Sequence, residues 1–197
     1  MKNENLLKVF AKYVSLNVLG MIALSCYILA DTFFVSKALG AAGLAALNLA
    51  IPVYNFIHGS GLMIGMGGGT KYSIYKSQGK KEAADQVFTN AAVAMICIAA
   101  IFFLAGLFAS APIARFLGGN EQTFEMARLY LQVLLLFTPM FMLNNLLLCF
   151  VRNDGAPQLS MAAMITGSLS NVVLDYVFMF PLGMGIFGAV LATGLAP

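Results

Sequence analysis

The sequence contains little charge and no tryptophan. Only 10% of its 197 residues are charged, whereas 60% are hydrophobic. An ordinary soluble domain carries about 25% charged residues. This composition excludes an ordinary water-soluble globular domain.

Residues that carry catalysis or bind transition metals are also scarce. His58 is the only histidine, and the cysteines Cys26, Cys97 and Cys149 lie in three different apolar runs. Their spacing fits neither a metal site nor a disulfide framework. Since no nucleophile–base pair or metal cluster is present, we expect no enzymatic activity, no cofactor and no nucleic-acid partner.

Long uncharged runs dominate the sequence. Six of them, 18 to 33 residues long, occupy 13–30, 38–70, 86–114, 129–151, 155–174 and 176–197. About 20 apolar residues in a helix cross the hydrocarbon core of a bilayer. The sequence therefore predicts an all-α polytopic membrane protein, a single bundle of about six transmembrane helices at roughly 13–36, 46–70, 87–110, 126–150, 159–180 and 186–197.

The connections and helix interiors carry further signals. The segment 109–122 is long enough to include a short interfacial helix, and Pro139 is expected to kink the fourth span. Gly61, Gly65 and Gly69 repeat at a spacing of four, which lets two helices approach closely. The sixth span stops about a dozen residues after its start. We therefore expect the chain to be truncated or to represent half of a larger unit.

Positive charge is distributed unevenly over the predicted loops. Eight lysines and arginines fall on one side and three on the other: Lys2, Lys8, Lys12, Lys71, Lys76, Lys80, Lys81 and Arg152 against Lys37, Arg115 and Arg128. Loops rich in lysine and arginine stay in the cytoplasm. We expect a multi-pass protein of the cytoplasmic membrane with its N-terminus inside.

Acidic side chains occur within two of the predicted spans. Asp31 lies near the outer end of the first span, and Asp175 lies about six residues from the outer end of the fifth. Asn171 precedes Asp175 by one helical turn, on the same face. Thr193 lies about seven residues into the sixth span. At 1.5 Å per residue, the two acids and Thr193 share a depth roughly 10 Å below the outer surface.

These four side chains suggest a small cation site. Carboxylate, amide and hydroxyl oxygens suit a proton or a hard cation such as Na⁺, and ionisable residues inside a membrane are functional by default. A structural hydrogen bond between helices is the alternative. Gln132, Asn144 and Asn145 in the fourth span are candidates to line an aqueous cavity or to join helices by hydrogen bonds.

The segments that contain these residues resemble a known family. "ADTFFV" (30–35), "SLSNVVLDYVFMF" (168–180) and "PLGMGIFGAVLAT" (181–193) are similar to the first, fifth and sixth helices of multidrug and toxic compound extrusion (MATE) antiporters. The resemblance covers nearly the whole chain as the N-terminal half, or N-lobe, of a two-lobed, twelve-helix exporter. The C-lobe is absent from this chain.

The resemblance implies a function and a site. It implies an antiporter driven by H⁺ or Na⁺ that exports amphipathic organic cations, with Asp31, Asn171, Asp175 and Thr193 as the cation site. The expected partners are the lipid bilayer, small organic cations and the missing lobe. Two alternatives stay open: a lipid-linked saccharide flippase of the same superfamily, which would prefer a cavity rich in Arg and Lys, and a non-transporting half-length membrane protein.

Overall fold

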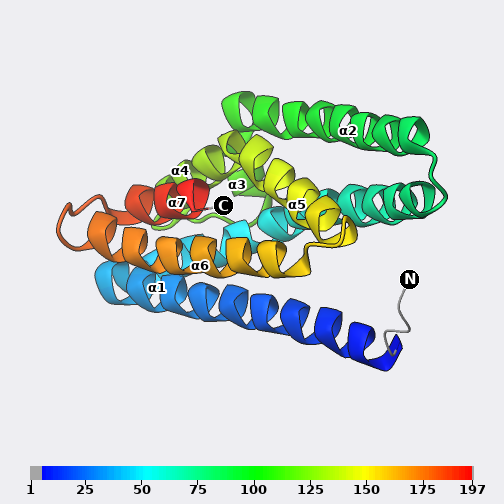
Figure 1. Cartoon of the computed structure of the whole chain (residues 1–197). Coiled ribbons are helices and arrows are strands. Elements are labelled where there is room, and N and C mark those ends of the chain that lie inside the picture. The colour runs from blue at the N-terminus through cyan, green and yellow to red at the C-terminus, as the bar shows by residue number, and fades with distance from the viewer. Residues whose placement is uncertain (1–5, 197) are drawn as a thin grey trace.

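The computed structural model describes residues 6–196, which form a bundle of α-helices (Figure 1). The helices are α1 (Leu6–Ser77), α2 (Lys81–Phe108), α3 (Ser110–Phe116), α4 (Phe124–Leu136), α5 (Thr138–Asn153), α6 (Pro157–Met179) and α7 (Gly185–Leu195). No β-strand occurs between residues 6 and 196. The predicted all-α class is confirmed.

Helix α1 consists of two arms that fold back on each other at Gly40. Gly40 has φ 64° and ψ −154°, a backbone region that essentially only glycine occupies. The first arm, residues 6–39, and the second arm, residues 41–77, therefore run in opposite directions (Figure 1). They correspond to the predicted spans 13–36 and 46–70, but a single residue replaces the loop expected between them.

The remaining helices follow the predicted order. Three described helices, α1, α2 and α6, are long and apolar enough to cross a membrane, and α4 with α5 forms a fourth such unit. Because α1 folds back at Gly40, each of its two arms is long enough to be one crossing. Helix α3 lies in the segment for which a short helix was expected, and α7 is shorter than a full span.

The fourth predicted span is bent. Helices α4 and α5 meet at an angle of 49°, and Pro139 occupies the first turn of α5, where its missing N–H has no intrahelical partner to lose. Phe137 lies at the break, and its ring packs against Gly194 of α7. A Cβ atom at Gly194 would lie 2.6 Å from that ring, so the bend and α7 fit together only because residue 194 is glycine.

Small residues bring the second arm of α1 against α5. A Cβ at Gly61 would lie 3.1 Å from the amide nitrogen of Asn145, and one at Gly65 would lie 3.1 Å from the Cβ of Cys149. A Cβ at Gly69 would lie 2.9 Å from the amide nitrogen of Asn153. The three glycines therefore serve the close helix packing that their spacing predicts.

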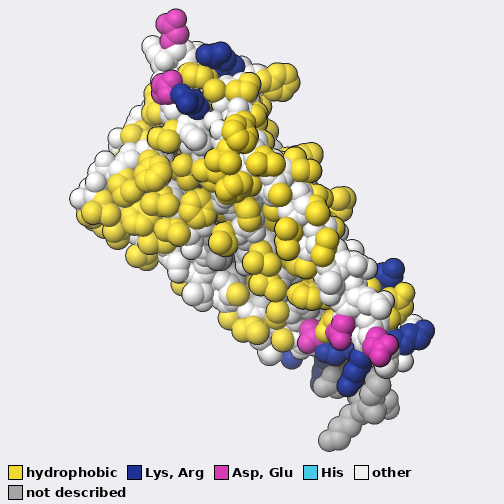
Figure 2. Space-filling view, turned by 90° about the horizontal axis from the view of Figure 1, so that it is seen from above, with side chains coloured by type: hydrophobic (Ala, Val, Ile, Leu, Met, Phe, Trp, Pro, Cys, Tyr) yellow, Lys and Arg dark blue, Asp and Glu magenta, His cyan; other side chains and the backbone are white. Residues whose placement is uncertain are grey.

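The outer surface matches a protein embedded in lipid. Figure 2 shows a broad belt of hydrophobic side chains, with charged side chains gathered near two ends of the molecule. Large apolar side chains such as Leu29, Ile96 and Phe108 are more than half exposed. Exposing such an apolar surface to water would be unfavourable, whereas contact with lipid hydrocarbon does not carry this cost.

Candidate functional site

The four side chains predicted to form a cation site come together from three helices. Asp31 lies on the first arm of α1, Asn171 and Asp175 lie on α6, and Thr193 lies on α7. Their exposed fractions are 7%, 1%, 0% and 7%, respectively. Polar groups buried to this degree need partners inside the protein.

Asn171 connects Asp175 on α6 with Thr193 on α7. With its amide oriented to satisfy both neighbours, its nitrogen donates to Asp175 Oδ2 at 3.1 Å and its oxygen accepts from the Thr193 backbone N–H at 3.3 Å. The hydroxyl of Thr193 donates to the carbonyl oxygen of Ala189 at 3.1 Å. The amide therefore fixes one carboxylate oxygen of Asp175 and joins α6 to α7.

One oxygen of each carboxylate has no hydrogen-bond partner among the described residues. Asp31 Oδ1 and Asp175 Oδ1 are buried and make no hydrogen bond to any described residue, and the two carboxylates interact electrostatically. Two buried negative charges near each other are strongly unfavourable. A proton or a small cation shared by these oxygens would relieve that cost, so the chemistry of the donor set fits H⁺ or Na⁺.

Tyr130 is a further member of the cluster. This residue of α4 is 4% exposed, and its hydroxyl interacts with Thr193 and, electrostatically, with Asp31 and Asp175. No specific feature of the sequence points to Tyr130, because a tyrosine in an apolar run is ordinary in a membrane protein.

A cavity of about 310 Å³ adjoins the cluster and lies among both arms of α1 and helices α5, α6 and α7. Asn171 and Thr193 belong to the cation cluster and also line this cavity. Asn17 of α1 and Arg152 of α5 line it as well. The cation site and a chamber of ligand size therefore share a wall.

Aromatic and amide side chains from both arms of α1 and from α5 form one part of the cavity wall. The hydroxyls of Tyr27 and Tyr54 lie 3.0 Å apart. The His58 ring stacks on Tyr54 with centroids 5.9 Å apart, and its Nδ1 lies 3.1 Å from the amide nitrogen of Asn145. The histidine thus makes a polar contact between the second arm of α1 and α5.

Two of the three predicted cavity residues reach this chamber. Asn144 and Asn145 line it. Gln132 is not among the lining residues, and its backbone carbonyl instead lies close to Gly106 of α2. Within the described residues no group of three or more His, Cys, Asp or Glu side chains could hold a metal ion.

Comparison with known proteins identifies the family. Residues 17–177 match the family model described as MatE. The chain belongs to the MatE family. Since family members are integral membrane transporters, this MatE chain is an integral membrane protein, and it corresponds to the N-terminal half of a MATE transporter.

Individual relatives agree with this assignment. Multidrug export protein MepA of Staphylococcus saprophyticus is 30% identical over 155 residues, 78% of this chain and 34% of the relative. A MOP superfamily transporter structure from Pyrococcus furiosus has a TM-score of 0.81 at 32% identity, covering 93% of this chain and 41% of that one. A MATE structure in complex with MaL6 has a TM-score of 0.87 at 31% identity, with shares of 93% and 41%. The matched part of the chain spans about a third of the length of the curated relatives.

Proposed function

We propose that this chain is the cation-coupling half of an antiporter in the cytoplasmic membrane that exports amphipathic organic cations in exchange for H⁺ or Na⁺. The observation that carries the proposal is the shared wall: Asn171 and Thr193 contact the buried carboxylate site on one side and the cavity on the other. The multidrug export name of the MepA relatives supports the substrate class.

The geometry supports coupling through conformation. A cation at Asp31 and Asp175 would pull the first arm of α1 toward α6, and the Asn171 bridge would carry the change to α7. Binding shifts an access equilibrium only if it favours one state differentially. A site whose oxygens come from three helices would meet this requirement, because any movement of these helices relative to one another changes the distances between the oxygens. A tenfold cation gradient then supplies about 1.4 kcal/mol per charge.

Ethidium efflux tests the proposal. Cells expressing the complete reading frame are compared with cells expressing Asp31→Asn or Asp175→Asn, with Glu125→Gln as the matched control on an exposed acid of α4. We expect each aspartate variant to lose efflux at unchanged membrane levels, whereas the control keeps it. Full efflux by both aspartate variants would refute the coupling site.

A further inference from the structure

Arg152 differs from every other residue that lines the cavity. It is the only charged side chain among the described lining residues, and it lies in the last turn of α5. A cation in the last turn of a helix interacts favourably with the helix dipole. That placement explains why an arginine is tolerated there, but it does not explain why the guanidinium reaches into the cavity.

The partners of Arg152 are neutral. One guanidinium nitrogen donates to Asn17 Oδ1 on the first arm of α1, and the other lies 3.6 Å from the Cys149 sulfur, a weak acceptor. A guanidinium has five N–H donors arranged to bind a carboxylate with two parallel hydrogen bonds. Among residues 6–196 no carboxylate forms an ion pair with Arg152.

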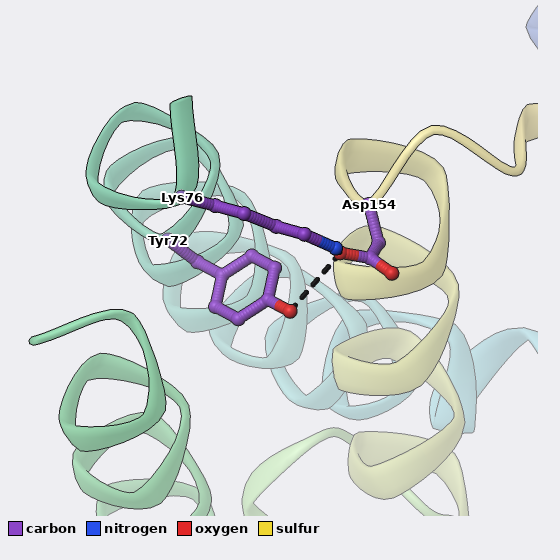
Figure 3. Close-up of polar contacts among 3 residues, drawn as sticks. All are labelled: Tyr72, Lys76 and Asp154. Atoms are coloured by element: carbon purple, nitrogen blue, oxygen red, sulfur yellow. Dashed lines mark hydrogen bonds and ion pairs between the residues drawn. The ribbon is translucent and has the colours of Figure 1, made fainter. Parts of the chain in front are cut away.

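Asp154, the acid nearest to Arg152 in the sequence, already has hydrogen-bond partners. Asp154 accepts hydrogen bonds from Lys76 and Tyr72 at the end of the second arm of α1. Figure 3 shows all three side chains converging. Arg152 is therefore a half-buried cation with spare donors that face a cavity of ligand size.

The surroundings of Arg152 specify what kind of molecule would fit. Met21, Leu148 and Met164 line the same cavity and offer adaptable apolar surface. Asn17, which Arg152 contacts, precedes Asp31 by 14 residues in the first arm, about 21 Å of helix. An anionic group at Arg152 would thus lie far from the two aspartates and escape their repulsion.

We propose that Arg152 is an anion-binding subsite that receives the carboxylate of an amphipathic, zwitterionic substrate. The carboxylate displaces Asn17 Oδ1 and takes two guanidinium N–H bonds, while the apolar body lies against the methionine-lined wall. This inference rests on the proposed export function and names the residue that would bind the anionic end of a substrate.

Two matched dyes test the subsite. Rhodamine B carries a free carboxylate, and its ethyl ester is the corresponding cation. The full protein is placed in phosphatidylcholine nanodiscs and titrated by fluorescence anisotropy, with the signal of empty nanodiscs subtracted. We expect Arg152→Gln to weaken rhodamine B binding about tenfold, the loss of one charge-assisted contact, and to leave the ester within about twofold. Arg152→Lys keeps the positive charge but cannot form the two parallel hydrogen bonds. Its affinity for rhodamine B should therefore lie between those of the wild type and Arg152→Gln.

Arg128→Gln is the control, because Arg128 is an exposed arginine of α4 paired with Glu125. Equal losses for dye and ester in Arg152→Gln would overturn the subsite, as would wild-type protein that binds the ester alone. Binding of rhodamine B without the ester would keep the subsite and contradict the organic-cation proposal. Loss of rhodamine B binding when phosphatidylglycerol is added would assign Arg152 to a lipid phosphate and also overturn the proposal.

Discussion

Replacing Asn171 with alanine would test whether one amide holds the cation site together. The change removes two contacts, the donation to Asp175 Oδ2 and the acceptance from the Thr193 N–H, at a residue that is 1% exposed. Hydrogen bonds between membrane helices average about 0.6 kcal/mol and reach about 1.7. The loss of both therefore predicts a decrease in the free energy of unfolding of about 1 to 3 kcal/mol.

Far-ultraviolet circular dichroism during thermal unfolding in detergent measures this decrease. Asn144→Ala is the matched control, since Asn144 lines the same cavity but has no side-chain hydrogen bond to another described residue. In a double-mutant cycle with Asp175→Leu, contacting residues should show an interaction energy of about 0.5 kcal/mol or more. Equal stability of Asn171→Ala and Asn144→Ala, together with strict additivity in the cycle, would refute the bridging role.

Two further predictions concern the stability of the fold. Gly194→Ala should destabilise the protein by about 1 to 3 kcal/mol through overpacking, because its Cβ would lie 2.6 Å from the Phe137 ring. Gly67→Ala, which meets nothing within 4 Å, should be neutral or stabilising by up to about 1 kcal/mol; the reverse order of melting temperatures would contradict the packing. Hydrogen bonding from Lys76, followed by that from Tyr72, holds the pKa of Asp154 below its ordinary value. The unfolded pKa is about 3.9, so the advantage of wild type over Asp154→Asn should be present at pH 5 to 7 and disappear as the pH falls below about 4. High salt should reduce this stability advantage. An advantage that grows as the pH falls would contradict the prediction.

The grouping of the buried polar residues could be predicted because helical geometry is regular. Asn171 and Asp175 share a face of any helix that contains both, and counting the rise from the outer ends places Asp31 and Thr193 at the same depth. In the structure all four are buried. The spans themselves follow from hydropathy, since every backbone group in lipid must be satisfied within a helix.

Other features depend on tertiary contacts that no local pattern encodes. The sequence predicts a loop between the first two spans, but one glycine with positive φ at residue 40 suffices for the reversal. Tyr130 and Arg152 were not expected at the site or in the cavity, because the direction of a side chain depends on how neighbouring helices are rotated. Gln132 was expected at the cavity but does not line it, for the same reason.

The charges around the cavity explain how one half of a transporter could treat ion and substrate separately. The acids Asp31 and Asp175 are buried behind Asn171 and Thr193, where a bulky molecule in the cavity meets amide and hydroxyl groups before it meets carboxylate. Arg152 occupies a different part of the wall, beside Asn17. Under the proposed function, a coupling ion small enough to pass the amide would bind without competing for the same atoms as the substrate. Competition between the two would then arise from the helix arrangement that each one stabilises.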